Sequence, residues 1–215
     1  MKFENTEVWG FEHALRGMRN PLESWSKSDS CFNLDNSYIG ENDLELAKKL
    51  IRAGSEHRKF MRQIFISVDI TAPIYWWKEF DTYKVGTVAN STSTMHKLAS
   101  TPISMGCFEV GDFADMPLGN GHSSTMNEWC KFVIPYLEQL RQDYLETKDK
   151  RYWKELIRLL PESWLQTRTI TLNYENLLSM IHQRKNHKLT EWSVDFISWV
   201  KCLPYSNEFI FMGEE

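Results

Sequence analysis

The sequence predicts an α+β fold, because segments with helical periodicity outnumber segments with strand periodicity and the two do not alternate in a regular βαβ rhythm. Apolar side chains alternate with other side chains over residues 64–70, which is typical of a half-buried strand. Residues 166–172 are a second β-prone segment. Helices are expected over residues 10–18, 42–53, from 75 onward, 126–148, 151–160, 173–184 and 190–203.

In the N-terminal half, residues 42–53 give the clearest helical pattern. Asn42 can cap this helix, its apolar residues form one stripe, and Gly54 ends it. Pro73 follows the first strand, and the aromatic residues after it are expected to pack inward from a new helix. Residues 84–96 are too rich in glycine and β-branched residues for a surface helix and too polar for a strand in the core.

In the C-terminal half, residues 99–125 are rich in glycine and proline, so we interpret them as a loop-rich insertion that forms a hairpin or a lid. Pro161 ends the helix over 151–160, and one face of the helix over 190–203 carries Trp192, Phe196, Trp199 and Val200. There are no repeats. The length fits a single domain over residues 1–215 that carries this insertion.

Charge and cysteine content exclude several classes of function. The net charge is −4, with 25 basic and 29 acidic residues, so the chain lacks the basic surface that binds duplex nucleic acid, although a few local cations can hold a small anion. The four cysteines are far apart and form no CxxC pair, which argues against a metal site and favours reduced thiols. No signal peptide and no membrane-spanning apolar run is found, so we expect a cytoplasmic protein without a membrane partner.

Two groups of residues could bind an anion. Hydroxyls and amides in the polar run Lys84–Thr94 can hold a phosphate, with Lys84 supplying charge, but on the residues alone the run is better explained by hydroxyls bonded to the backbone. Arg158, Arg168 and Arg184 are candidates for phosphate or uracil recognition, whereas cations at a helix end are also explained by the helix dipole. The histidines and cysteines lack the spacing of a metal site or a nucleophile.

Three blocks together resemble the flavin-dependent thymidylate synthases, the thymidylate synthase-complementing proteins. The first block is GSEH at 54–57, followed by the strand and by API at 72–74. In the second, TYKVGTVANSTST at 82–94 falls on the family motif RHRxxSxNxxSxR. The third comprises LP at 160–161, TLN at 171–173, Leu177 and Arg184. The order and spacing of the blocks match the family, and the chain is a divergent member by this resemblance.

The resemblance implies helices packed on a small, mostly antiparallel sheet. It also implies a homotetramer that holds FAD and deoxyuridine monophosphate at sites shared between subunits, with NADPH and methylene-tetrahydrofolate as co-substrates. No enzyme cysteine attacks the uracil in this family. The expected function is reductive one-carbon transfer to deoxyuridine monophosphate or a related pyrimidine nucleotide. The alternative is the same fold without synthase activity, as a nucleotide-binding or oligomeric interaction protein.

The resemblance also assigns roles to individual residues. The catalytic residues would be Arg184 and Thr92. The substrate-binding residues would be Arg158, Arg168, Thr92, Thr94 and Arg184. The cofactor-binding residues would be His57, Lys59, Thr82, Tyr83, Lys84, Asn90, Asn173 and Ser179.

Several positions depart from the family motif. Its arginines fall on Thr82, Lys84 and Thr94, its histidine falls on Tyr83, and a flavin-contacting arginine falls on Glu175. Each lost charged hydrogen bond costs on the order of 1.5–3 kcal/mol, so other cations have to compensate. The candidates for this compensation are Lys59, Lys78, Lys97 and Arg168.

Overall fold

The structure is a computed structural model that describes residues 1–33, 37–111 and 126–212. A four-stranded sheet in the order β1-β4-β6-β5 lies at its centre, and every pair of neighbours is antiparallel. Its strands are β1 (Lys2–Trp9), β4 (Phe65–Pro73), β5 (Val88–Ser91) and β6 (Leu165–Asn173). The expected mostly antiparallel sheet is therefore confirmed.

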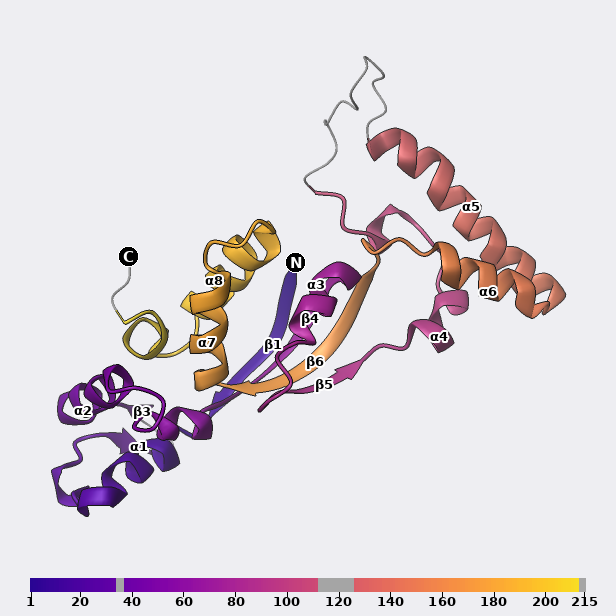
Figure 1. Cartoon of the computed structure of the whole chain (residues 1–215). Helices are drawn as coiled ribbons and strands as arrows, with labels where there is room; N and C mark the ends of the chain where they lie inside the picture. Colours follow the sequence, from indigo (N-terminus) through magenta and orange to yellow (C-terminus); the bar gives the residue numbers. More distant parts are fainter. Residues whose placement is uncertain (34–36, 112–125, 213–215) are drawn as a thin grey trace.

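Helices cover one face of the sheet and extend the molecule at both ends (Figure 1). The covering elements are α3 (Ile74–Phe80), α7 (Tyr174–Arg184) and α8 (Ile197–Lys201). At one end lie α1 (Phe11–Arg19), α2 (Glu41–Arg52) and the two-stranded ribbon β2 (Cys31–Phe32) and β3 (Ser37–Tyr38). At the other end lie α4 (Thr94–Lys97), α5 (Met126–Thr147) and α6 (Lys150–Leu159).

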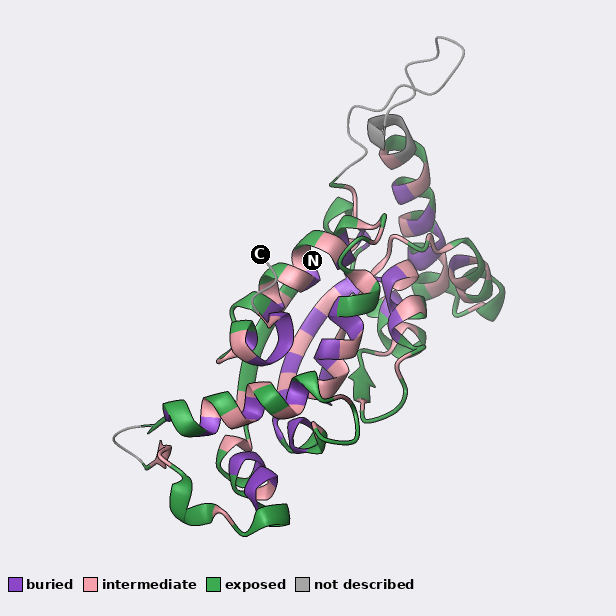
Figure 2. Cartoon of the chain, turned by 60° about the vertical axis from the view of Figure 1, so that its left-hand side comes forward, coloured by how far each residue is buried: buried purple, intermediate pink, exposed green. Residues whose placement is uncertain are grey.

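Alternation places the two central strands between a core and an uncovered face. In β4, Ile66, Val68 and Ile70 are buried beneath the helices, while the residues between them are only partly buried (Figure 2). Ile170 and Leu172 of β6 continue the same buried face. The predictions of strands over 64–70 and 166–172 are confirmed, and each strand differs by only one to three residues at its ends.

Sequence periodicity did not predict the two outer strands. In β1 the register shifts between Glu4 and Glu7, so the chain has no continuous alternation to recognise. The four residues of β5 are all exposed, and this edge strand pairs with β6 through its backbone. Residues 84–96 were expected to be too polar for a strand in the core, and β5 agrees with this, because an exposed edge strand needs no apolar face.

The helix α2 begins earlier than expected and is capped from a distance. Its N-cap is Gly40, so the prediction of Asn42 as the cap was wrong. The carboxylate of Asp29 accepts hydrogen bonds from the backbone N–H groups of Asn42 at 2.9 Å and Asp43 at 3.1 Å. A carboxylate from another segment therefore satisfies the free donors of the first turn.

The C-terminal helix prediction was correct in position but not in type. Residues 191–196 form a π-helical turn that continues into α8, and a second π-helical turn spans 207–211. Trp192, Phe196 and Val200 are buried on one face as expected. In this turn the ring of Trp192 stacks on that of Trp76 in α3, with ring centres 4.5 Å apart.

The buried side chains form two separate clusters. The larger lies between the sheet, the covering helices and α1 and α2. The smaller one joins α5 and α6 to the segment 98–108 through Leu98, Ile103, Phe108, Leu137 and Leu156. The described part of the loop-rich insertion therefore packs against α5. Residues 112–125 of the predicted hairpin or lid lie outside the described residues.

Glu138 fastens the insertion to α5 and gives a prediction for acid stability. It accepts hydrogen bonds from Arg141 at 2.6 Å and from the Ile103 N–H at 2.8 Å, and the first of these chiefly lowers the pKa of Glu138 to about 2. Since the folded pKa lies below the unfolded one, this stabilisation is present above about pH 4.5 and is lost as the pH falls toward 2.

Glu138→Gln is therefore expected to lower the free energy of unfolding by about 1–3 kcal/mol at pH 7. Urea denaturation at pH 7 and at pH 2.5 measures the effect, which should shrink at the lower pH. Glu146→Gln, at an exposed position of the same helix, is the matched control. An equal loss at both pH values would contradict the role assigned to the carboxylate.

Among the described residues, no helix is long and apolar enough to cross a membrane. All four cysteines are free thiols. No group of three or more histidine, cysteine or acidic side chains in the described ranges is placed to hold a metal ion.

Candidate functional site

Arg184 lies at the end of α7, where protein groups surround its guanidinium. Its Nε donates to the Tyr83 hydroxyl at 2.8 Å, and its Nη1 pairs with the Glu79 carboxylate at 2.5 Å. The guanidinium also lies 4.8 Å from the ring centre of Trp192. His187 approaches the same Glu79 oxygen at 3.3 Å. This cluster holds Arg184 in one orientation, and it fixes Tyr83, the residue at the position of the motif histidine.

The hydroxyls just before the polar run and in its first part turn toward the backbone. Thr82 Oγ1 donates to the carbonyl of Glu79 at 2.7 Å, and Thr87 Oγ1 donates to the carbonyl of Tyr83. Lys84 is exposed, and with Tyr83 and Thr87 it lines a shallow hollow of about 260 Å³. Here the structure matches the interpretation of the run as backbone-bonded hydroxyls.

The second part of the run opens onto a larger hollow of about 620 Å³. Thr92 and Thr94 line it together with Lys2, Lys97 and Cys107. One carboxylate, Glu109, also lines the hollow, so the two ammonium groups leave a positive charge that, with the hydroxyls, suits an anionic ligand. The cysteine lies in this hollow although nothing in the sequence around it suggested a site.

Arg168 is linked to this hollow through one side chain. Its Nε donates to Gln166 Oε1 at 3.0 Å, and Gln166 Nε2 donates to the carbonyl of Thr92 at 2.9 Å. Arg168 also pairs with Asp81 at 2.7 Å and lies 4.3 Å from the ring centre of Trp77. Arg168 therefore helps to position the Thr92 backbone indirectly, through Gln166.

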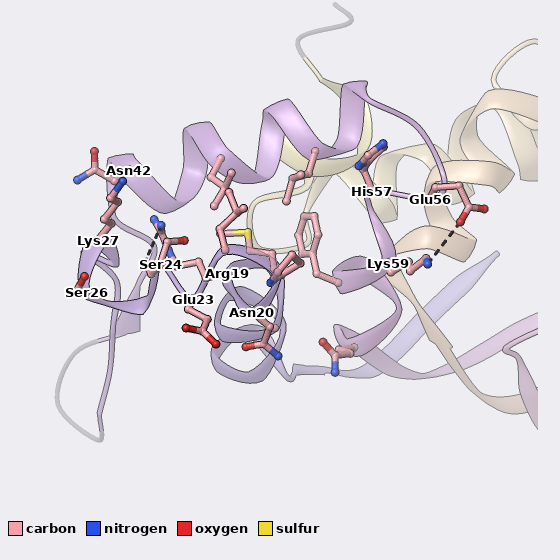
Figure 3. A pocket seen from close by; sticks show the side chains of 18 residues that line it. Arg19, Asn20, Glu23, Ser24, Ser26, Lys27, Asn42, Glu56, His57 and Lys59 are labelled. Atoms are coloured by element: carbon pink, nitrogen blue, oxygen red, sulfur yellow. Dashed lines mark hydrogen bonds and ion pairs between the residues drawn. The ribbon is translucent and has the colours of Figure 1, made fainter.

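His57 and Lys59 line a third and larger hollow of about 1250 Å³ between α1, α2 and the turn over 59–63 (Figure 3). Leu46, Leu50 and Phe60 form its apolar part. Lys59 pairs with Glu56 at 3.5 Å on the rim. An apolar floor with a few charged groups on its edge is the usual composition of a small-molecule site.

The amino end of α7 joins two segments that the resemblance associates with the cofactor. Asn173 caps the helix by accepting from the Asn176 N–H at 3.0 Å, and Asn176 Nδ2 donates to the carbonyl of Val85 at 2.8 Å. Gly86 has a φ of 76°, and a Cβ there would lie 3.0 Å from Asn176. Only glycine lets the altered motif approach the helix this closely.

Sequence reasoning missed two arginines beside this helix end. Arg58 Nε and Arg62 both pair with the carboxylate of Glu175, the former at 3.3 Å. Burial opposes ionisation of Glu175, but the hydrogen bonds from Arg62 and Arg58 outweigh it and lower its pKa. The signal in the sequence was the cationic run HRKFMR at 57–62, which stands next to the matched histidine.

The remaining predicted residues are scattered. Arg158 pairs with Glu155 on the exposed side of α6 at 3.3 Å and does not line the hollow of Thr92. Asn90 is exposed on β5, and Ser179 accepts a hydrogen bond from Gln183 at 3.4 Å on α7. Lys78 pairs with Glu162. In the described part of one chain, His57, Thr92 and Arg184 thus lie in three separate places.

Comparison with solved structures identifies the fold. The flavin dependent thymidylate synthase ThyX from Helicobacter pylori complexed with FAD and dUMP matches with a TM-score of 0.70, at 16% identity and 99% coverage of both chains. A second structure of the Helicobacter pylori ThyX with FAD and dUMP matches with a TM-score of 0.70 at 16% identity. This match covers 99% of the present chain and 98% of the ThyX chain. The UMP/dUMP methylase PolB from Streptomyces cacaoi, bound with 5-Br dUMP, matches with a TM-score of 0.63 at 14% identity. This match covers 99% of the present chain and 94% of the PolB chain.

These likenesses confirm the fold predicted from the sequence, with helices packed on a small antiparallel sheet as in flavin-dependent thymidylate synthases. No protein-family model matches the sequence. No curated protein matches it at a significant level. At this low identity the likeness establishes the fold alone, and the activity has to be argued from the residues.

Proposed function

We propose that the protein is a divergent flavin-dependent thymidylate synthase-like enzyme that transfers a one-carbon unit reductively to deoxyuridine monophosphate or a related pyrimidine nucleotide. The observation that carries the proposal is the match along 99% of both chains to a synthase complexed with FAD and dUMP. The three blocks on which the resemblance rests lie around the central sheet: the first leads into β4, the second contains β5, and the third contains the end of β6 and α7. FAD, NADPH and methylene-tetrahydrofolate are the cofactor and co-substrates of this proposal.

The surface chemistry of this chain fits a flavin nucleotide. The hollow of His57 combines an apolar floor with a rim that carries lysines and glutamates, and the hollow of Thr92 and Thr94 offers hydroxyls and ammonium groups. A planar ring with phosphate groups requires both kinds of surface. The bound flavin would supply the hydride. His57, Lys59 and Asn173 would bind the flavin, and Thr92 and Thr94 would bind the pyrimidine nucleotide.

The separation of these residues favours a site shared between copies of the chain. One chain presents His57 and Thr92 in different hollows, so a complete site requires a second copy that brings the two together. A homotetramer provides such contacts. Arg184 would act within the nucleotide site by stabilising charge on the pyrimidine. Mass determination in solution, with and without FAD and dUMP, tests the assembly, and a stable monomer under both conditions would contradict it.

The visible absorption spectrum after reconstitution with FAD tests the function most directly. The expected result is a yellow protein that releases flavin on denaturation and that methylates dUMP when NADPH and methylene-tetrahydrofolate are supplied. Product analysis with deoxyuridine and deoxycytidine monophosphates identifies the pyrimidine. A colourless protein that retains no flavin would refute the proposal.

The alternative is a protein with this fold that binds a nucleotide or another subunit without synthase activity. Two observations favour it specifically: the Arg184 guanidinium is already paired with Glu79, and Thr87 donates to a backbone carbonyl. The two functions are separated by combining the flavin spectrum with dUMP titration. Binding of dUMP without flavin retention or product would select the alternative.

A further inference from the structure

Arg58 and Arg62 form a paired cationic cluster with Glu175 at the amino end of α7. Arg58 Nε lies 3.3 Å from Glu175 Oε1, and Arg62 contacts both carboxylate oxygens through Nε and Nη2. The cluster is accessible, since the side chains of Arg58, Arg62 and Glu175 are 26%, 52% and 15% exposed. Two guanidiniums face one carboxylate, so the cluster keeps a net positive charge.

The guanidiniums retain hydrogen-bonding capacity. Each carries five N–H donors in a planar fork. In the described part of the chain, Arg58 uses only its Nε, and Arg62 uses its Nε and Nη2. Both terminal nitrogens of Arg58 and one of Arg62 are therefore available to a ligand. Glu175 holds the two side chains near each other, which reduces the entropy lost when a phosphate binds between them.

An exposed aromatic pair lies at the same end of the sheet. The rings of Trp9 and Phe65 stack with centroids 5.8 Å apart, and they are 44% and 37% exposed on the face that no helix covers. Phe65 is paired in the sheet with Asn173, the cap of α7, and lies three residues after Arg62. Exposed aromatic rings can stack a planar base or ring, while the guanidiniums at the amino end of α7 can hold a phosphate.

We propose that Arg58 and Arg62, positioned by Glu175, bind a phosphate of the nucleotide ligand in place of the cations missing from the altered motif. The inference rests on the proposed function and deepens it. The family carries a flavin-contacting arginine at the position of Glu175 in this chain. The Glu175 carboxylate binds Arg58 and Arg62, which precede β4, and so holds both at the amino end of α7. The positive charge that the family carries at the position of Glu175 is therefore supplied here by the two arginines that pair with Glu175. The carbonyl of Val85, in the motif itself, is bonded to the next residue, Asn176.

The test measures binding of FAD, riboflavin, dUMP and inorganic pyrophosphate to the full chain. The double variant Arg58→Gln/Arg62→Gln is expected to lose about tenfold or more in affinity for the phosphate-bearing probe that uses the cluster, and to bind riboflavin as the wild type does. Arg58→Lys/Arg62→Lys keeps the positive charge but not the planar fork of donors, so its affinity should lie between those of the wild type and the double glutamine variant. Arg151→Gln, which breaks an exposed ion pair with Asp149 on α6, is the matched control and should change nothing.

The probes separate the source of the phosphate. A loss for FAD alone assigns the cluster to the flavin, and a loss for dUMP alone assigns it to the pyrimidine nucleotide. If the wild type binds no flavin, the proposed function fails, whereas a loss of dUMP or pyrophosphate binding in the double variant still supports the cluster. Unchanged affinities for FAD, dUMP and pyrophosphate in a double variant of native circular dichroism would overturn the inference, as would a wild type that binds none of them.

Discussion

Asp43→Ala is expected to lower the free energy of unfolding by about 3–5 kcal/mol, because it leaves the charge of Arg19 buried without its partner. The side chains of Arg19 and Asp43 are 4% and 0% exposed, and Arg19 Nε lies 2.5 Å from Asp43 Oδ1. The other carboxylate oxygen accepts from the hydroxyls of Ser28 and Ser30, each at 2.6 Å. Asp43 therefore connects α1, α2 and the segment between them through one side chain.

Urea denaturation at pH 7 measures this loss. Asp43→Asn keeps the shape and some of the hydrogen bonds, so it should cost less than Asp43→Ala. The double variant Arg19→Leu/Asp43→Leu removes both charges and is expected to recover much of the stability, because apolar side chains of similar volume replace a buried ion pair at little net cost. If Asp43→Ala lowered the free energy of unfolding by less than about 1 kcal/mol, the stabilising role assigned to the Arg19–Asp43 pair would be wrong.

The same carboxylate gives a pH dependence of known sign. Burial raises the pKa of Asp43, but hydrogen bonds from Ser28, Ser30 and Arg19 outweigh burial and lower it below 3.8. Stability from this group is therefore complete above the unfolded value and is lost as the pH falls through the lower folded value. The difference between wild type and Asp43→Asn should accordingly narrow below about pH 4.

The central strands and most helices could be predicted because their patterns are local. Ile66, Val68 and Ile70 alternate within one segment, and the stripe of α2 lies within twelve residues. The capping of α2 could not be predicted, since the carboxylate comes from Asp29, thirteen residues before Asn42. The register shift in β1 contains Asn5, whose φ of 51° lies in the left-handed region, but a single asparagine is too weak a signal to locate a bulge from the sequence.

The sequence named candidate site residues, but it could not indicate what surrounds them. Spacing alone pointed to Arg184, yet its partner Glu79 is 105 residues away, and no local pattern could indicate that the guanidinium is already paired. Glu175 looked like the loss of a cation, because Arg58 and Arg62 precede it by 117 and 113 residues. Charge compensation between distant segments is visible only after the chain has folded.

Trp192→Ala is expected to cost about 3–5 kcal/mol of stability, the range for truncating a fully buried large aromatic residue. Trp192 is 0% exposed, and its ring lies 4.5 Å from that of Trp76 and 5.1 Å from that of Phe196. Its indole Nε1 has no hydrogen-bond partner among the described residues, so the loss comes from packing. Val194→Ala, in the same turn and 52% exposed, should change stability by no more than about 0.5 kcal/mol in the same urea titration.

Trp192 also connects the core to the candidate site, because the Arg184 guanidinium lies on its face at 4.8 Å. A cation over an aromatic ring contributes about 0.5–2 kcal/mol, depending on its exposure. Trp192→Phe retains a ring and most of the packing but offers a smaller face, so it should remain folded while Arg184 is held less firmly. If Arg184 acts on the pyrimidine, the affinity for dUMP should fall in Trp192→Phe and stay unchanged in Val194→Ala. An unchanged affinity in a folded Trp192→Phe would instead assign the Trp192–Arg184 contact to stability alone.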